Sequence, residues 1–419
     1  MISSRLRLQN IACVIAALLC GSCDDAQQRD GAAAPVVDAD SPRDLARIVE
    51  RLVPTLERIS GLDRREALRV RWQPREEARR YVATRLEHEL PPAELESLRR
   101  TYVALGLLPD TLDLHALLLD LYTEQVLGYY APTERTLFIV EGAEADEVQV
   151  IAHELVHALQ DQHTNLDSLV APDRGNDRQT AAHAALEGHA MLVMITLLAE
   201  RAAGRQVDPV SLAPPALDQE EAMAAQEAEF PVFRRAPRIV RETLLFPYIE
   251  GAAFVHALWT SRAPLPRYPA PLDSLMPQST EQVIAPGEHF IRERDEPVPV
   301  TLGSAPAGWR MLREDGLGQL EMSIFLAHHV DDAARAATVG WEGDRYALLE
   351  APGNHDVLYW VSLWETAADA DRFADAVRSA AGRRPARSVS VLRAERDGRA
   401  AVQVIDAPAG VDVTPLQTR

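Results

Sequence analysis

The stretch "VIAHELVHALQDQH", residues 150–163, holds His153, Glu154 and His157 in an HExxH spacing. On a helix, residues four apart lie one turn above each other, so both imidazoles can point at one zinc ion. Glu154 follows His153 directly and would project beside the open coordination position. Zinc lowers the pKa of its bound water to about 7, and Glu154 can accept the proton as that water attacks a carbonyl. The spacing therefore predicts the chemistry of a zinc hydrolase.

Apolar residues flank the motif, which indicates that its helix is buried. They are Val150, Ile151, Leu155, Val156 and Leu159. Two histidines and a glutamate along a buried helix need polar partners, because an unpaired polar group away from water is costly. Surface histidines on a solvated helix would not need these flanks. We therefore favour a metal site over a pair of surface histidines.

A catalytic zinc site needs a third protein ligand, and the sequence offers two candidates. His163 lies six residues after His157, at the third-histidine position of HExxHxxGxxH enzymes. Those enzymes need glycine at position 160 to turn the chain back, but the residue here is Gln160. A continuing helix would carry His163 about 9 Å along its axis from His157, too far for a shared ion. We therefore predict that Glu187, in "AALEGHAML" on the next long helix, is the third ligand.

Two further histidines share the predicted helix of Glu187. His183 lies one turn before Glu187 on the same face. It could be a fourth ligand, a hydrogen-bond donor to bound substrate, or a histidine at the edge of the core, and we favour the last. His189 points roughly 200° around the helix from Glu187, so we interpret it as structural.

The oxyanion that forms in this chemistry needs a hydrogen-bond donor, commonly a tyrosine or a histidine. Tyr248, ahead of an expected Gly-Ala-Ala helix in "FPYIEGAAF", is the first candidate, and Tyr129 or Tyr130 is the second. For each tyrosine alone, the simpler interpretation is a ring at the core edge with its hydroxyl in water. Residues Thr136–Val140 have the pattern of a strand just before the HExxH helix. We expect it to be an edge strand that pairs with an extended substrate.

The elements around these residues predict an α+β fold. Residues 42–300 have the pattern of a mainly helical, zincin-like metallopeptidase domain with a short edge sheet, in which Gly251 would permit close helix packing. Residues 301–410 predict a small antiparallel α+β domain with four strands. In that domain, "GWEGDRY" has the composition of a tight turn, and we interpret His328 with His329 as a helix end.

The N-terminal segment, residues 1–23, has the features of a bacterial secretion signal. Two arginines precede a short apolar run, which cannot span a bilayer as a helix. The run ends at "CGSC", so we favour a lipoprotein-type signal peptide with lipidation of Cys23 over an ordinary secretory signal. Cys23 and the two cysteines before it are the only ones, so the mature body has no disulfide. Residues 24–41 are small and polar and predict a flexible tether.

The composition of the 419-residue chain excludes several classes of function. Its net charge is −20, which opposes binding to a phosphate backbone, so we expect no nucleic-acid partner. None of its 43 basic residues is lysine, which removes Schiff-base and Walker-type phosphate chemistry. No apolar run long enough to span a bilayer follows the signal. We therefore expect a cell-envelope protein that contacts the membrane through its lipid anchor alone, or that is otherwise secreted.

Several segments together resemble a family of bacterial secreted or lipoprotein HExxH proteins that are described as zinc metallopeptidases. They are "GYYAPTERTLFIVEG", "AHELVHALQDQH", "AALEGHAML", "FPYIEGAAFVHAL", "PQSTEQVIAPGEHF" and "GWEGDRYALLE". The resemblance spans most of residues 43–380. It implies a gluzincin-like site with zinc on His153, His157 and Glu187, and with Glu154 as the base.

The sequence departs from this pattern at two places. Enzymes of the thermolysin type have an aspartate four residues after the ligand glutamate, where this chain has Met191. Asp161 or Asp177 could supply the carboxylate that orients a ligand histidine instead. Glu342 stands where the family commonly has glycine.

Chemistry and resemblance together predict zinc-dependent hydrolysis of peptide bonds in a peptide or protein substrate, with one zinc per chain. A different class of function stays open: a non-catalytic envelope binding or scaffold lipoprotein whose zinc is structural. His183 discriminates between the two, because a fourth protein ligand would close the coordination position that catalysis needs. A third option is zinc hydrolysis of a non-peptide amide or ester in the cell wall.

Overall fold

The computed structural model describes residues 36–37, 45–142, 147–212, 227–411 and 413. The predicted signal peptide, Cys23 and most of the predicted tether lie outside the described residues. Within the tether, strand β1 (Val36–Val37) pairs in parallel with β2 (Arg69–Gln73). The prediction of a flexible tether is therefore wrong at these two positions, because a neighbouring strand holds their backbone.

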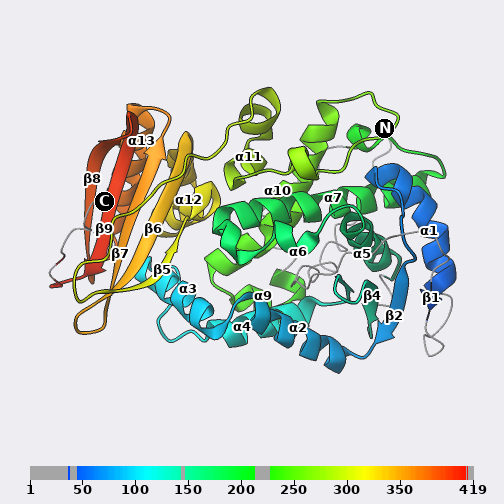
Figure 1. Cartoon of the computed structure of the whole chain (residues 1–419), viewed down its shortest axis with the longest axis horizontal. Coiled ribbons are helices and arrows are strands. Elements are labelled where there is room, and N and C mark those ends of the chain that lie inside the picture. Colours follow the sequence, from blue (N-terminus) through cyan, green and yellow to red (C-terminus); the bar gives the residue numbers. More distant parts are fainter. Residues whose placement is uncertain (1–35, 38–44, 143–146, 213–226, 412, 414–419) are drawn as a thin grey trace.

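The first part of the chain is mainly helical, as predicted, and lies to the right of the C-terminal sheet in Figure 1. In α1 (Leu45–Ser60), buried residues recur every three or four positions, so one face packs on the core. Among the described residues, the other helices of this part are α2 (Arg75–Glu89), α3 (Pro92–Ala104), α4 (Leu114–Gln125), α5 (Glu147–Asp161), α6 (Leu166–Leu169), α7 (Asn176–Ala203), α9 (Pro231–Arg235), α10 (Arg238–Thr260) and α11 (Thr280–Ile284). Short turns of 3₁₀ type, η2 (Pro172–Arg174), η3 (Pro209–Ser211) and η4 (Asp273–Leu275), and a π-helical turn, η5 (Gly287–Arg292), lie between them.

Helices α7 and α10 touch through their backbones at two glycines. A Cβ on Gly188 would lie 1.9 Å from the carbonyl carbon of Gly251, and a Cβ on Gly251 would lie 2.0 Å from the carbonyl oxygen of Ala184. Only glycine fits such a crossing, so the expected close packing at Gly251 is confirmed. The crossing fixes the distance between Glu187 on α7 and Tyr248 on α10.

Helix α7 is long and apolar enough, by length and composition, to cross a membrane, and no other helix among the described residues is. However, 83% of its most apolar window is buried inside the molecule. Its composition is that of a central core helix, which is hydrophobic on all sides because other elements surround it.

A four-stranded sheet, in the order β1-β2-β4-β3, packs against α5. Strand β4 (Thr136–Val140) pairs in parallel with β2 on one side and antiparallel with β3 (Gly128–Ala131) on the other. The prediction that β4 is a substrate-binding edge strand is therefore wrong, because both of its edges are already hydrogen-bonded. All four residues of the outer strand β3 are buried. This end of the sheet therefore offers no open edge to an extended substrate.

The last part of the chain forms a five-stranded antiparallel sheet, which confirms the predicted antiparallel α+β architecture of this region (Figure 1). Helix α12 (Gly318–His329) lies at the border with the helical part and ends at His328 and His329, as predicted. Helix α13 (Ala367–Gly382) packs on the sheet. The strand order is β5-β6-β7-β9-β8, with β5 (Arg310–Asp315), β6 (Trp341–Ala351), β7 (His355–Trp364), β8 (Arg387–Arg396) and β9 (Arg399–Pro408).

The predicted tight turn at "GWEGDRY" is wrong. The segment begins strand β6, with a β-bulge between Trp341 and Gly343. A bulge inserts a residue without ending the strand, and its glycines imitate the composition of a turn. Strand β5 carries charged residues along most of its length, so it lacks the apolar alternation that would predict it. Residues 332–338 form a 3₁₀ helix, η6.

One hydrophobic core joins the helical part to the C-terminal sheet. Buried residues from Leu45 in α1 to Val404 in β9 belong to a single cluster. Ion pairs add to this contact, since Arg100 on α3 pairs with Glu350 and Asp356 on the sheet. The helical part and one face of the sheet therefore share a core, while a second cluster of buried residues covers the other face of the sheet.

Candidate metal centre

Helix α5 carries the HExxH residues on a face that is closed to solvent. His153, Glu154 and His157 are all almost fully buried. The long helix α7 packs across α5 and carries Glu187, which is buried as well. Four polar side chains therefore share an interior where only mutual contacts or a bound ion can satisfy them.

Three of these side chains meet at one point, His153, His157 and Glu187. Nε2 of His153 lies 3.0 Å from Oε2 of Glu187 and 3.0 Å from Nε2 of His157. Nε2 of His157 lies 3.4 Å from the same carboxylate oxygen. A tetrahedral zinc ion with bonds near 2.1 Å separates its ligand atoms by about 3.4 Å. The three atoms thus have nearly the spacing that one shared zinc ion requires.

The second candidate for third ligand lies elsewhere. Helix α5 runs through Gln160, as the sequence predicts, but ends at Asp161, so His163 lies beyond the helix rather than at its C-terminal end. Beyond it, Nε2 of His163 lies 2.7 Å from the backbone carbonyl of Asp63. His163 therefore has a local hydrogen bond and does not belong to the cluster.

The charges within the cluster depend on one another, because burial removes the screening of water. Burial alone would raise the pKa of Glu187, but His157 and His153 lower it to about 2. Burial alone would lower the pKa of His157, but the Glu187 carboxylate raises it to about 9. Burial lowers the pKa of His153 to about 4. The cluster therefore holds an ionised carboxylate in a dry interior, which favours a cation at this point.

A chain of hydrogen bonds sets the tautomer of His157. Its Nδ1 lies 2.9 Å from Oε1 of Gln160, and the Gln160 amide nitrogen donates to the carbonyl of Leu186. The same nitrogen lies 3.0 Å from Nδ1 of His189, whose Nε2 lies 3.0 Å from the carbonyl of Ser60. Because a carbonyl only accepts, the order of donors runs from His157 to Gln160, from Gln160 to His189, and from His189 to the carbonyl. The pKa of about 9 keeps a second proton on His157 until an ion displaces it; the ring then carries its remaining proton on Nδ1 and presents the Nε2 lone pair to the metal position.

Gln160 and His189 are the site residues that the sequence prediction misses. From the sequence, Gln160 indicates only a continuing helix, and His189 only a structural residue. One signal was available, because Gln160 lies three residues after His157 and so on the same helical face. No spacing in the sequence links His189 to these hydrogen bonds, since α5 and α7 meet only in the folded molecule.

Neither acidic residue proposed to orient a ligand histidine does so among the described residues. Asp161 accepts a hydrogen bond from the Tyr130 hydroxyl at 2.8 Å. Asp177 accepts from the backbone N–H and the hydroxyl of Thr280. The prediction of an orienting carboxylate is therefore wrong, and the uncharged amide of Gln160 takes that place.

Glu154 lies beside the cluster with one carboxylate oxygen held. Its Oε2 accepts the backbone N–H of Tyr130, on β3, at 3.0 Å. Its Oε1 is buried and has no hydrogen-bond partner among the described residues. Burial raises the pKa of Glu154 to about 8. A carboxyl group with such a pKa can gain and lose a proton near neutral pH, as a general base and acid must.

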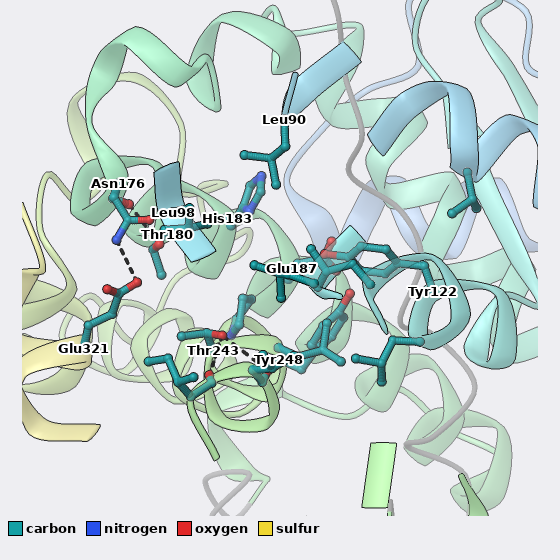
Figure 2. Close-up of a pocket in the computed structure, with 18 of the residues that line it drawn as sticks. Leu90, Leu98, Tyr122, Asn176, Thr180, His183, Glu187, Thr243, Tyr248 and Glu321 are labelled. Carbon is teal, nitrogen blue, oxygen red and sulfur yellow. Dashed lines mark hydrogen bonds between the residues drawn. The ribbon is translucent and has the colours of Figure 1, made fainter. Parts of the chain in front are cut away.

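A cavity of about 270 Å³ reaches Glu187, and Figure 2 shows side chains that line it. Its wall is mostly aliphatic and aromatic, and includes Leu90, Leu98 and Tyr122. Polar residues are fewer than apolar ones in this wall. Pockets that bind a small molecule or a substrate side chain usually have this character. The cavity is thus the open space next to the candidate metal ligands.

Tyr248 lines the cavity and stands next to the cluster. Its ring centroid lies 6.3 Å from that of His153. Burial, with Glu187 and Glu154 nearby, raises the pKa of its hydroxyl well above the ordinary value. The hydroxyl therefore keeps its proton and can donate a hydrogen bond. Contrary to the prediction, Tyr248 does not precede a helix but lies inside α10.

The other two candidate tyrosines use their hydroxyls elsewhere. The Tyr129 hydroxyl bonds to the side chain of Gln73, and the Tyr130 hydroxyl bonds to Asp161. Tyr130 instead serves the site through its backbone N–H, which holds Glu154. Tyr248 is therefore the best placed of the three to donate toward the cavity.

His183 faces the same cavity, one turn before Glu187 (Figure 2). It is not among the three residues whose ligand atoms come together. Its Nε2 atom is buried without a hydrogen-bond partner among the described residues. Burial lowers the pKa of His183 to about 4, so the ring is neutral at neutral pH. A neutral imidazole with an unused polar atom is suited to bind a polar group that enters the cavity.

Residues 309–416 of the chain match a family described as a domain of unknown function, DUF8575. No curated protein and no solved structure gives a significant match to the chain. The matched stretch covers the C-terminal sheet with α12 and α13, and it does not include the metal cluster. This match therefore says nothing of the part of the chain that holds His153, His157 and Glu187.

Proposed function

We propose that the protein is a zinc-dependent hydrolase of peptide bonds, with zinc held by His153, His157 and Glu187. The observation that supports this most is the spacing of their ligand atoms, 3.0 to 3.4 Å, between two buried helices. Bound zinc would polarise a substrate carbonyl and lower the pKa of a water molecule.

Glu154 would be the general base and, later, the general acid. The N–H of Tyr130 holds one of its oxygens in place, which leaves the unpartnered Oε1 to accept a proton from the attacking water. Returning that proton to the leaving amine completes the reaction without a second acid. A pKa of about 8 allows Glu154 to perform both transfers.

Tyr248 and His183 would act on the substrate oxygen. Both line the cavity beside Glu187, and both are neutral groups that can donate a hydrogen bond. Donors that are fixed before the reaction lower the energy of the oxyanion more than solvent does. Because His183 stands apart from the three clustered ligands, a coordination position is left for water and substrate, which favours the enzyme over the scaffold alternative.

The substrate would enter through the cavity rather than by adding a strand to the sheet. Strand β3 is buried and β4 is paired on both sides, whereas the cavity gives direct access to Glu187. The apolar wall favours a substrate that offers a large apolar side chain next to the scissile bond. Short peptides and chain ends fit such an entry better than the middle of a folded protein.

The deciding experiment is Glu154→Gln, which keeps the size of the side chain and removes its proton acceptor. We expect wild-type zinc content and a loss of hydrolysis of at least about 100-fold on a library of fluorogenic peptides. His163→Ala is the matched control, because it lies on the same segment but outside the cluster, and it should keep both zinc and activity. If Glu154→Gln equals wild type in every assay, the site is structural and the scaffold alternative is correct. If ester or non-peptide amide substrates alone are cleaved, the cell-wall alternative is correct.

We also propose that the mature protein is anchored to the cell envelope through a lipid on Cys23. This rests on the signal pattern of residues 1–23, together with the burial of α7. Cys23→Ser should release the protein into the soluble fraction, because a lipid chain supplies its membrane affinity. Retention of the variant on membranes after a salt wash would show that another contact holds it.

A further inference from the structure

A second group of metal-ligating side chains lies apart from the HExxH cluster. It consists of Glu281 at the start of α11, His289 in the π-helical turn η5, and Asp295 just after that turn. None of these residues takes part in the first cluster, and Figure 1 shows α11 well away from α5, with α10 and α7 labelled between them. The group is therefore a separate site with its own ligands.

The ligand atoms of the three side chains face one another. Nε2 of His289 lies 4.0 Å from Oε1 of Glu281, while the other ring nitrogen, Nδ1, lies 3.3 Å from Oδ2 of Asp295. A single ion would take only one of these two nitrogens. One ligand atom from each residue lies within 4.8 Å of the others. A shared ion needs about 3.4 Å between ligand atoms, so ligand atoms up to 4.8 Å apart must approach by as much as about 1.4 Å. Asp295 is more exposed than its two partners and can make that movement.

Glu281 supplies the observation that points to a missing partner. Its side chain is almost fully buried, with a relative exposure of 2% for the residue. Yet Oε1, the oxygen that faces His289, has no hydrogen-bond partner among the described residues. A buried carboxylate oxygen without a partner is unfavourable, because burial removes its water and nothing replaces it.

The surroundings of Glu281 are negatively charged. The carboxylates of Asp295, Glu365, Asp177 and Glu342 all act on it electrostatically. Of these neighbours, Glu342 also has a buried oxygen, Oε2, without a hydrogen-bond partner among the described residues. A cation at this point would offset the negative charge of these carboxylates and give the unpartnered oxygen of Glu281 a partner.

The backbone holds the candidate ligands in place before any ion binds. The N–H of Asp295 donates to the carbonyl of His289 at 2.9 Å, which closes the turn between them. The side-chain amide of Gln282, next to Glu281, donates to the carbonyl of Asp295. Such π-helical turns are frequent at functional sites, because they displace a side chain from the regular helical position. Here the turn directs His289 toward both carboxylates.

We propose that Glu281, His289 and Asp295 form a second metal site, which binds a divalent transition-metal ion such as Zn²⁺ or Mn²⁺. One imidazole nitrogen and two carboxylates suit these ions, whereas Ca²⁺ and Mg²⁺ prefer oxygen ligands alone. Because Glu342 lies in strand β6 and Glu365 directly follows strand β7, the ion would tie the segment 281–295 to that sheet. The site would thus be structural, and it does not rest on the proposed hydrolase function.

Metal counts on the full mature chain test this proposal, with Zn²⁺ as the probe. After reconstitution and removal of free metal, elemental analysis should give two zinc ions per wild-type chain. His289→Ala and Glu281→Gln should each give one, and Glu187→Ala combined with His289→Ala should give none. Glu281→Gln is the conservative variant, because it keeps the shape of the side chain and removes only its charge. His328→Ala, a histidine at the end of α12, is the control and should keep two.

Each other outcome overturns one of the two sites. One zinc in the wild type that persists in His289→Ala and disappears in Glu187→Ala would overturn the second site and leave the hydrolase proposal standing. One zinc in the wild type that disappears only in His289→Ala would overturn the zinc site at His153, His157 and Glu187 and leave the second site standing. If His289→Ala keeps a second zinc, and Ca²⁺ displaces that zinc as easily as it does from the wild type, then the imidazole is not a ligand. The assigned class of metal would then be wrong. Circular dichroism spectra of each variant show whether the fold is kept.

Discussion

Gln160 accepts a hydrogen bond from Nδ1 of His157 at 2.9 Å, in the position where an orienting carboxylate was expected. A glutamine can do this and also donate to the carbonyl of Leu186, which an ionised carboxylate cannot do. The amide also adds no charge, so Glu187 remains the one ionised carboxylate that contacts the ligand histidines among the described residues. The geometry of His157 is therefore set without changing the charge of the cluster.

Gln160→Leu tests the importance of this hydrogen bond. We expect zinc affinity to fall by about 10- to 100-fold, because His157 loses the partner that selects its tautomer. The measurement is competition for zinc against a chelating dye at neutral pH. Gln160→Glu restores an acceptor for His157 and should recover part of the loss. Unchanged affinity in Gln160→Leu would show that packing alone orients the ring.

Glu187→Ala and His163→Ala distinguish the two candidate third ligands. Glu187→Ala removes one of three protein bonds to zinc, so the first cluster should lose its metal. His163→Ala should keep that metal, because its Nε2 lies against the Asp63 carbonyl instead. Elemental analysis of both variants gives the answer. The opposite pattern, with metal lost only in His163→Ala, would mean that the loop after α5 rearranges to supply the ligand.

Gly188→Ala tests whether the α7–α10 crossing supports the site. The added Cβ would meet the Gly251 backbone at 1.9 Å, so the helices must separate. We expect a loss of about 3 kcal/mol in the free energy of unfolding, measured with urea. Gly382→Ala is the control, because no heavy atom lies within 4 Å of its added Cβ at the end of α13. That control should change stability by less than about 1 kcal/mol. Equal stabilities of the two variants would contradict a rigid crossing.

Glu321→Gln tests the pH dependence of stability. Burial raises the pKa of Glu321 from 4.5 to about 7, so the native state keeps a proton that the unfolded chain loses above pH 4.5. Stability from this group is therefore present below pH 4.5 and is lost as pH rises to 7, by up to about 1.4 kcal/mol per pH unit. The variant should show a flatter dependence, since Tyr102 and Asn176 both donate to Oε1, which glutamine retains. Urea unfolding at pH 5, 6 and 7 measures the slopes, and equal slopes would contradict the shift.

Several features of the candidate site could be predicted from the sequence because they depend on local spacing. His153 and His157 share a face through the helical period, and Gln160 in place of glycine indicates that α5 continues. The long apolar pattern of α7 places Glu187 in the core, where a carboxylate needs partners. The strands β6 to β9 carry the apolar runs from which the antiparallel sheet was predicted.

Tertiary structure alone decided which distant residues meet. Strand β4 is an inner strand because β2 pairs with it, although three helices separate the two strands in the sequence. No local sequence pattern predicts that partner. Ser60, Gln160 and His189 form one chain of hydrogen bonds only because α1, α5 and α7 pack together. Glu281 meets Asp295 only because the π-helical turn folds the chain back. Local periodicity fixes which face a side chain occupies, whereas the packing of whole elements fixes what that face touches.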